Sequence, residues 1–326
     1  MSLSLVTGAT GLLGANIVRA LVARGEKVRA FVFEDSIALK DLPIETIRGD
    51  VRDKESVAAA MKGVTNVYHV AAVVSLWAPD PEPMRKVNVG GTRNVFEAAL
   101  RAGVRRALQV STVDALGLRT PGRPADEDVP FGTGHAVPTA YATTKHEAEQ
   151  TALSFLSKGL EVVVVNPTYM LGAWDTRPTS GRILLEIAKG RVVGYPSGGN
   201  NFVDVEDVAE AALTAMEKGT PGRRYILGNE NMTYRAAFRL FAEIVGARPP
   251  LFPIPHALAS LGGRLGEQVG HWTKREPFLH VAAAESGYMD HYFDPSRARR
   301  ELGLRRTPVQ VAAERAWRWF CDHGYR

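Results

Sequence analysis

The chain has 326 residues, 45% of them hydrophobic and 23% charged, with a formal net charge of +5. This composition is typical of a globular protein with a large core, and it excludes a disordered or fibrous chain. The single cysteine, Cys321, cannot form an internal disulfide, and no apolar run reaches the ~18 residues of a membrane-spanning helix. The arginines at 297–306 lack the aromatics and the motif of a nucleic-acid site. We therefore expect a cytoplasmic protein with no membrane span and no nucleic-acid partner.

Short β-rich apolar runs alternate with helical patterns through the first half of the chain. Strands are expected at 3–7, 27–33, 44–49, 66–70, 106–111 and 160–167, and helices at 12–24, 53–62, 83–102 and from 140 onward. Such alternation predicts βαβ units, and therefore an α/β fold with a doubly wound parallel sheet. After Pro167 the order loosens, because the loop-rich stretches TRPTSGR, GYPSGGNN and ARPPLFPIP separate the expected helices.

A glycine-rich turn, TGATGLLG, joins the first expected strand to the first helix. Its glycines, Gly8, Gly11 and Gly14, suit a tight turn, close approach of the backbone to a pyrophosphate and close helix–strand packing. The helix N-terminus then offers unpaired N–H groups to the phosphates. The turn predicts a dinucleotide-binding domain over residues 1–167, to which some later segments return, and a mainly substrate-binding lobe over 168–326. Other contacts expected from the turn are Thr10, Leu12 and Leu13.

The stretch TAYATTKHEAEQ places Tyr141 and Lys145 four residues apart at the start of an expected helix. Residues at this spacing share one face of a helix. A nearby cation would lower the tyrosine pKa from its ordinary value of about 10, and the lysine could also hold ribose hydroxyls. The pair predicts proton exchange between Tyr141 and a substrate oxygen, with hydride transfer at a bound nicotinamide. Alone, the spacing would equally describe a helix-surface pair.

Further motifs accompany these two in a fixed order: GDVRD, YHVAA, VNVGGTRNVFEAA, VSTVDALG, YATTK and VVNPTYMLG. With G-x-x-G-x-x-G before them, nearly the whole chain resembles the extended branch of the short-chain dehydrogenase/reductase family, in its NAD-dependent epimerase/dehydratase group. It is most similar to proteins resembling dihydroflavonol 4-reductase and hopanoid-associated sugar epimerases. The resemblance implies a Rossmann fold, NAD or NADP as cofactor, and a homodimer formed through two long helices, here 83–102 and 140–157.

The resemblance also implies roles for individual residues. Counting back five from Gly117, as in the family's pattern, places the hydroxyl that orients the substrate at Thr112, with Ser111 as the alternative. Tyr141 and Lys145 would be the acid/base and its cationic partner, and both would contact the cofactor. Further cofactor contacts are expected from Phe33, Glu34, Asp50, Val51, Ala71, Ala72, Asn88, Pro167, Thr168 and Met170.

The end of the second expected strand decides between the two cofactors. An acidic residue there accepts from the ribose 2′-OH of NAD, whereas an arginine accommodates the 2′-phosphate of NADP. Relatives resembling dihydroflavonol reductase have arginine where Phe33 stands, and Glu34 and Asp35 follow it here. Because these carboxylates would repel a 2′-phosphate, the sequence favours NAD, although Arg29 or Lys40 could still accommodate NADP.

The substrate side departs from the sugar-nucleotide epimerases that the chain resembles as far as NNFVDVEDVAEA. Those enzymes have a phosphate-gripping arginine where Asn200 stands, although Arg182 or Arg191 could substitute for it. Apolar residues follow YHVAA and NPT, which suits a hydrophobic carbonyl or alcohol, while ordinary core packing would explain the same aromatics. The expected substrate contacts are Val73, Trp77, Thr112, Tyr169, Trp174 and Asn201.

Together these patterns predict an NAD(P)-dependent oxidoreductase that reversibly reduces a ketone or aldehyde carbonyl on a small-molecule substrate. One alternative is a nucleotide-sugar epimerase or dehydratase that retains its NAD. The other is a dinucleotide-binding sensor without turnover, which would not need the Tyr–Lys–hydroxyl set. No histidine, cysteine or carboxylate cluster has metal-ligand spacing, so no metal is expected.

Overall fold

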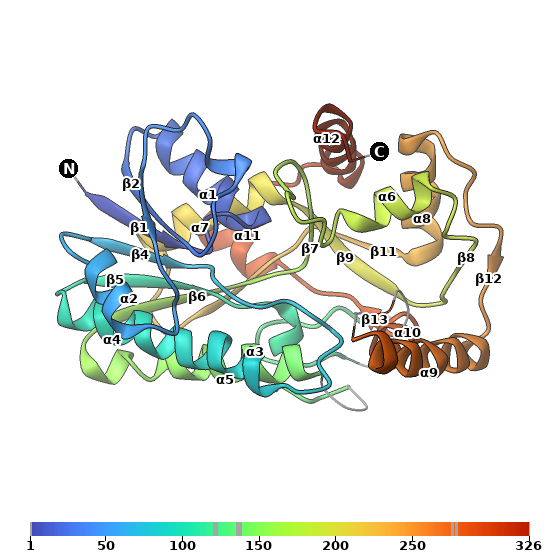
Figure 1. Ribbon diagram of the computed structural model, residues 1–326, viewed down its shortest axis with the longest axis horizontal. Helices are drawn as coiled ribbons and strands as arrows, with labels where there is room; N and C mark the ends of the chain where they lie inside the picture. The colour runs from blue at the N-terminus through green and yellow to red at the C-terminus, as the bar shows by residue number, and fades with distance from the viewer. Residues whose placement is uncertain (1, 120–122, 135–138, 275–276, 278–279, 326) are drawn as a thin grey trace.

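A seven-stranded parallel sheet forms the centre of the protein (Figure 1), which is described here from a computed structural model covering residues 2–119, 123–134, 139–274, 277 and 280–325. The strand order is β3–β2–β1–β4–β5–β6–β10. Each of the six strands predicted from sequence lies within one residue of its expected bounds. The strands are β1 Leu3–Thr7, β2 Lys27–Val32, β3 Glu45–Arg48, β4 Asn66–His69, β5 Arg106–Val110, β6 Glu161–Pro167 and β10 Arg224–Leu227.

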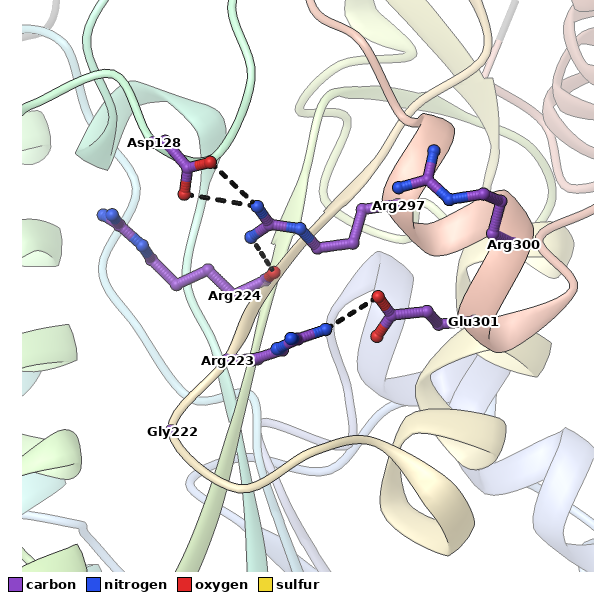
Figure 2. A pocket seen from close by; sticks show the side chains of 7 residues that line it. All are labelled: Asp128, Gly222, Arg223, Arg224, Arg297, Arg300 and Glu301. Atoms are coloured by element: carbon purple, nitrogen blue, oxygen red, sulfur yellow. Dashed lines mark hydrogen bonds and ion pairs between the residues drawn. The ribbon is translucent and has the colours of Figure 1, made fainter.

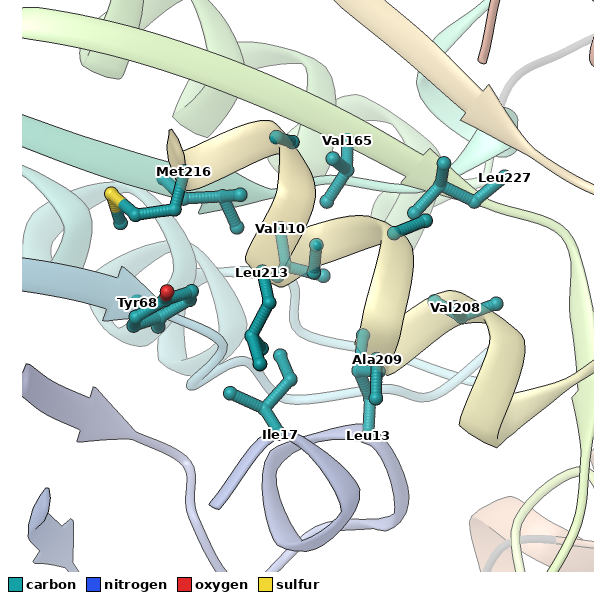
Figure 3. Close-up of a cluster of buried hydrophobic side chains, with 14 of the residues drawn as sticks. Leu13, Ile17, Tyr68, Val110, Val165, Val208, Ala209, Leu213, Met216 and Leu227 are labelled. Atoms are coloured by element: carbon teal, nitrogen blue, oxygen red, sulfur yellow. The ribbon is translucent and has the colours of Figure 1, made fainter. Parts of the chain in front are cut away.

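Helices cover both faces of this sheet, as Figure 1 shows, so the predicted doubly wound α/β fold is confirmed. One face carries α1 (Leu12–Ala23), α7 (Val205–Lys218) and α11 (Ser296–Leu302), and the other carries α2 (Lys54–Ala60), α4 (Thr92–Arg101) and α5 (Ala140–Leu153). Figure 3 shows the core of the first face, where Ile17 of α1 meets Leu213 of α7 beneath Val110 of β5. Burial of both sheet faces explains the continuous apolar run in β6.

Two elements of the central layer come from beyond Pro167. Strand β10 pairs with β6 at the edge of the sheet, and α7 packs beside α1. The chain therefore crosses from the lobe to the sheet and back again. This crossing places the lobe against the carboxyl ends of the strands, where open α/β sheets bind their ligands.

The lobe contains a small sheet in which β9 pairs with β7, β11 and β13. Its core lies among α6, α8 and α12 around Phe202 and Phe241. Short 3₁₀ turns lie at Ile37–Leu39, Val113–Ala115 and Leu156–Lys158. The lobe elements are β7 Tyr169–Leu171, α6 Arg182–Ala188, β8 Gly194–Tyr195, β9 Gly199–Asp204, β11 Glu230–Thr233, α8 Tyr234–Val245, β12 Phe252–Pro253, α9 His256–Thr273, α10 Val281–Ser286, β13 Asp290–His291 and α12 Val309–Asp322.

Two features differ from the sequence expectation. The helix predicted at 83–102 is α3 (Glu82–Arg85), a π-helical segment (Lys86–Gly91) and α4 in succession. A wide turn arises there because Asn88 is bonded to a neighbouring loop, and π-segments often mark functional positions. The stretches GYPSGGNN and ARPPLFPIP, expected to be loops, contain strands β8, β9 and β12, which are too short or too rich in glycine and proline to show a β pattern. Among the residues described, we find no helix long and apolar enough to cross a membrane.

Candidate active site

The glycine turn between β1 and α1 is built from close backbone contacts. Gly8 has a φ of +65°, and a Cβ there would lie 2.6 Å from the Ala71 backbone nitrogen. A Cβ at Gly14 would lie 2.1 Å from the Gly8 oxygen, so both positions exclude any side chain. At Gly11 the nearest heavy atom to a Cβ is 3.5 Å away, so the protein itself does not require glycine there. Because Gly11 has no side chain, it instead leaves space in front of the α1 N-terminus.

This arrangement fits a dinucleotide pyrophosphate. Gly11 is the N-cap of α1 and supplies no side-chain cap, so the amides of the first helical turn face outward without partners. The side chains of Leu12 and Leu13 are buried, so these residues could contact a phosphate only through their backbone. Thr10 is anchored by its carbonyl oxygen, which accepts from the Thr176 hydroxyl at 3.3 Å.

Replacing Gly14 with alanine should weaken both the fold and cofactor binding. The new methyl group would overlap the Gly8 carbonyl, so the turn must shift, and we expect a loss of about 1–3 kcal/mol in the free energy of unfolding. NAD titration and thermal melting measure the two effects. The matched control is Gly90→Ala, where a Cβ meets nothing within 4 Å. Equal behaviour of the two variants would contradict this account of the turn.

Tyr141 and Lys145 lie one turn apart near the start of α5, and both are buried. The helix begins there because the Thr139 hydroxyl caps it, accepting from the Ala142 amide at 3.1 Å. The Lys145 ammonium donates to the Val110 carbonyl oxygen at the end of β5, at 2.7 Å. This hydrogen bond holds α5 at the carboxyl end of β5, on the edge of the sheet where β1 leads into the glycine turn.

The electrostatics of the pair differ from the sequence expectation. Burial raises the pKa of Tyr141 well above its ordinary range, and the charge of Asp114 raises it further, while a hydrogen bond with Thr112 opposes both. Burial lowers the pKa of Lys145 to about 8, and the charge of Glu149 opposes that fall. The Lys145 ammonium is directed at the Val110 carbonyl oxygen, and burial is the largest influence on the Tyr141 phenol. Tyr141 is therefore neutral at pH 7 and is suited to donating a proton.

The structure separates the two candidate hydroxyls. Thr112 contacts Tyr141, and its hydroxyl donates to the Asp114 carboxylate at 3.2 Å. The Ser111 hydroxyl is buried without a hydrogen-bond partner, and its backbone amide donates to Val165 on β6. Thr112 is thus the hydroxyl associated with Tyr141, as the count from Gly117 indicated.

Asp114 and Tyr234, which the sequence did not single out, interact with this group. The charge of Asp114 raises the pKa of Tyr141. In the lobe, burial raises the pKa of Tyr234, a hydrogen bond with Asn200 opposes that rise, and the charge of Asp114 adds to it. The Asn200 amide donates to the Tyr234 hydroxyl at 3.3 Å. The Asp114 charge therefore acts on one tyrosine of the sheet side and on one of the lobe. The place of Asp114 two residues after Thr112, in VSTVDALG, was the available signal.

A buried carboxylate supports the site from behind. The Glu149 side chain is fully buried, one turn beyond Lys145 on the same face of α5. It accepts from the Asn166 amide at 3.0 Å, and that amide also donates to the Thr112 carbonyl oxygen at 3.0 Å. The other Glu149 oxygen lies 3.5 Å from the Arg224 guanidinium. Glu149 thereby links the neighbourhood of the lysine to the backbone of the hydroxyl-bearing residue.

The expected cofactor contacts along β4 lie at the same edge. Asn88, in the π-helical segment, accepts from the Val73 amide at 2.8 Å and donates to both the Val73 carbonyl oxygen and the Thr144 hydroxyl at 3.1 Å. It therefore joins the segment after Ala71 and Ala72 to α5. His69 is held between Thr7 and Thr92, and burial, followed by the charge of Lys145, lowers its pKa to about 3. This histidine is a neutral core residue.

Further expected contacts lie beyond β2, β3 and β6. Phe33 is exposed at the end of β2, Glu34 pairs with Arg177, and Asp35 lies 3.5 Å from Arg48. The Asp50 carboxylate is paired with Arg52, and the hydrogen bonds from Arg52 lower the pKa of Asp50. The remaining expected contacts are Val51, packed against Gly91, and Pro167, Thr168 and Met170, which end β6 or follow it.

The expected substrate contacts are not all placed together. Val73 is 40% exposed beside Asn88, and Trp77 makes an edge contact with His271 of α9. Tyr169 donates to the Ser180 carbonyl oxygen at 2.7 Å and packs on Phe202.

The other two expected substrate contacts are engaged within the protein. Trp174 lies under the Arg19 guanidinium and against Trp319 of α12. Asn201 is fully buried and makes hydrogen bonds with Asn229, Asn231 and Phe293. The neighbours of Trp174 and Asn201 therefore support structural roles.

A separate polar cleft lies at the other end of β10 (Figure 2). Two of its arginines are paired, Arg223 with Glu301 at 2.8 Å and Arg297 with Asp128 at 3.0 Å. Arg224 begins β10, so the cleft lies at the amino end of that strand, and the Arg224 guanidinium also lies 3.5 Å from the Glu149 carboxylate. The full lining is Asp128, Gly222, Arg223, Arg224, Arg297, Arg300 and Glu301.

Comparison with known proteins places the chain in a family. The model of the NAD dependent epimerase/dehydratase family matches residues 4–228. A putative dihydroflavonol 4-reductase of Synechocystis is 36% identical, over 98% of this chain and 95% of its own length. Sterol demethylase protein B of Methylococcus capsulatus is 38% identical over 98% of this chain and 99% of its own length. The 3 beta-hydroxysteroid dehydrogenase/Delta 5-->4-isomerase of Mycobacterium tuberculosis is 32% identical over 92% of this chain and 85% of its own length.

Solved structures share the whole architecture. The crystal structure of gox2253 is 37% identical with a TM-score of 0.87, covering 99% of both chains. The UDP-glucose 4-epimerase of Thermus thermophilus in complex with NAD is 25% identical with a TM-score of 0.76, covering 98% of this chain and 99% of its own. With the family model and the relatives, these matches show that the chain belongs to the NAD-dependent epimerase/dehydratase family, within the extended short-chain dehydrogenases/reductases, and is an NAD(P)-dependent enzyme.

Proposed function

We propose that the protein reduces the carbonyl of a hydrophobic ketone or aldehyde, reversibly, with Tyr141 as the acid/base. The observation that carries this proposal is the group formed by buried Tyr141, Thr112 and Asp114, in which the Asp114 charge also acts on Tyr234, the partner of Asn200. A neutral phenol with a high pKa can give its proton to a carbonyl oxygen. Asn200 stands where sugar-nucleotide epimerases have a phosphate-gripping arginine, and an uncharged amide suits an uncharged substrate better than a nucleotide diphosphate.

The residues divide the reaction between them. A nicotinamide cofactor held at the glycine turn would supply the hydride that the carbonyl carbon accepts. Tyr141 donates its proton to the carbonyl oxygen, so the carbonyl gains a hydride and a proton and becomes an alcohol. The Thr112 hydroxyl orients that oxygen, and Lys145 holds the ribose. In the reverse direction Tyr141 recovers the proton as the alcohol is oxidised.

The names of two relatives support an apolar substrate. One relative is called a sterol demethylase protein and the other a hydroxysteroid dehydrogenase, and each covers more than nine-tenths of this chain. Val73 and Val74, both partly exposed beside the site, present the apolar surface that such a substrate would need. We propose a ring-containing or long-chain carbonyl compound of this kind, with Val73, Trp77 and Tyr169 as its apolar contacts.

The experiment that tests the function is a substrate panel. Steroid ketones, flavonoid ketones and long-chain 3-oxo compounds are each mixed with reduced cofactor, and nicotinamide oxidation is followed by absorbance. UDP- and GDP-sugars are incubated without added cofactor. Turnover of carbonyls in proportion to added cofactor supports the proposal. Copurifying NAD with interconversion of sugar nucleotides would replace it with the epimerase alternative, and cofactor binding without any turnover would favour the sensor.

We expect the protein to bind NAD more tightly than NADP. Glu34 and Asp35 lie at the end of β2, and the Arg29 guanidinium is occupied by Glu45 and by the Ala60 carbonyl oxygen. Calorimetric titration of Glu34→Gln should bring the two affinities closer by about tenfold, which corresponds to ~1.4 kcal/mol. Glu45→Gln, which removes a carboxylate away from the expected ribose position, is the control. A wild-type preference for NADP would show that Arg177 and Arg48 bind the 2′-phosphate instead.

We also propose a cytoplasmic homodimer formed through α4 and α5. These helices lie side by side on one face of the sheet, where Figure 1 shows no further layer over them. A solution mass equal to that of one chain would contradict the dimer.

A further inference from the structure

Helix α9 presents an apolar stripe on its outer side. Its large apolar side chains recur at intervals of three or four residues, which places them on one face of a helix. Each is more than half exposed, from 54% at Leu261 to 88% at Trp272. Surface helices usually turn such a face toward the core. The stripe consists of Leu258, Leu261, Leu265, Val269 and Trp272.

Small residues, rather than these, hold α9 to the protein. Ala259, Gly263 and Gly270 are the buried residues of the helix. A Cβ at Gly263 would lie 3.0 Å from Val281 at the start of α10, so the backbones approach closely there. Because small residues provide the packing, the large apolar residues are not needed to fix α9 in place. The outward orientation of the stripe is therefore a property of the folded protein.

Charges of both signs lie beside the stripe: the Glu285 carboxylate of α10 pairs with His256 at the start of α9, and cations lie farther along the helix. Arg264 and Lys274 are exposed on α9 and at its C-cap. Glu267, the acidic residue of α9, accepts from the Val281 amide and is turned toward α10. An outward apolar stripe with flanking cations and a terminal tryptophan is the pattern of a helix that lies in a membrane interface near anionic head groups.

The stripe also adjoins the candidate active site. His271, next to Trp272, makes an edge contact with Trp77 at a centroid distance of 6.0 Å. Trp77 belongs to the segment after β4 whose Val73, Val74 and Leu76 are 39–59% exposed. The Val73 amide donates a hydrogen bond to Asn88 beside the site. Exposed apolar residues therefore lead from the neighbourhood of Tyr141 to the end of α9.

We propose that α9 docks the protein on the surface of an anionic lipid bilayer, with its apolar stripe among the head groups and acyl chains. The docking is peripheral. The mouth of the active site then faces the lipid, from which an apolar substrate can reach Tyr141 without passing through water. The direction of substrate passage rests on the proposed function, whereas the docking itself does not.

Vesicle flotation of the full chain, without substrate or cofactor, tests the docking. The vesicles contain either phosphatidylcholine alone or equal parts of phosphatidylcholine and phosphatidylglycerol. We expect flotation with the anionic vesicles and at least about a tenfold loss of affinity in Leu261→Gln/Leu265→Gln, because two apolar side chains leave the interface. Arg264→Gln/Lys274→Gln should remove the preference for anionic lipid and keep the weaker apolar binding.

Ile37→Gln is the matched control, since Ile37 is 48% exposed in the 3₁₀ turn that follows β2. Circular dichroism of each variant checks that it is folded. Failure of the wild type to float, or equal flotation of the leucine variant, would overturn the proposal. So would a fall in solution mass in the leucine variant without any vesicle binding, because the stripe would then join two copies of the chain. None of these outcomes depends on turnover, so the proposed function is tested separately by the carbonyl panel.

Discussion

Tyr141→Phe is expected to lower kcat for carbonyl reduction by about 10²–10⁴-fold, because it removes the proton donor and keeps the ring. The ring of Tyr141 is buried on α5, so the phenylalanine should occupy the same space. The loss should fall on kcat rather than on cofactor affinity. Stopped-flow measurement of nicotinamide oxidation, together with a cofactor titration, separates the two quantities.

A matched control for this variant is Tyr195→Phe, which deletes a phenol oxygen on β8 outside the site. It should leave kcat unchanged. If Tyr141→Phe retained the activity of the wild type, the proton would have to come from another group. The catalytic assignment of Tyr141 would then be wrong, even if the protein still bound NAD.

Glu149→Gln is expected to alter the pH dependence of the reaction. The pKa of Lys145 is lowered by burial to about 8, and the charge of Glu149 is the influence that raises it. The lysine is protonated below that pKa, so kcat/KM of the wild type should fall as the pH rises through about 8. Without the Glu149 charge the pKa falls further, and the decline should begin at lower pH. A pH profile of kcat/KM measures this shift.

The same substitution should also weaken the fold. Glu149 is fully buried and paired with Arg224, so removing its charge leaves a half-buried cation with a poorer partner, and we expect a loss of about 1–3 kcal/mol in the free energy of unfolding. Glu147→Gln is the control, because Glu147 lies on the same helix but pairs with Arg85 at the surface. An unchanged pH profile in Glu149→Gln would show that the carboxylate has only a structural role.

The sequence by itself determined six of the seven strands of the central sheet, the glycine turn and the order of the motifs. These are local properties. A buried parallel strand needs a continuous apolar run, and a turn that excludes a Cβ at Gly8 and Gly14 accepts only glycine. The spacing of Tyr141 and Lys145 likewise placed them on one helix face. Residue type and spacing carry this information because each constraint acts within a few residues.

The tertiary structure alone decided which distant groups meet. Asp114 and Tyr234 are 120 positions apart in the numbering, and only the return of the lobe to the carboxyl edge of the sheet brings them to one site. The direction of the tyrosine pKa was misjudged because burial, which depends on all surrounding elements, is the largest influence on the Tyr141 phenol and raises its pKa.

The aromatics and the apolar stripe show the same limit. Trp174 was expected to contact the substrate, yet it packs on Arg19 and α12, since one aromatic suits either environment. Apolar periodicity predicts a helix with an apolar face, but the direction of that face depends on what packs beside it. In α9 the close approach of Gly263 to α10 turns the leucines outward. The sequence therefore specified the chemistry of each element, and long-range packing decided its surroundings.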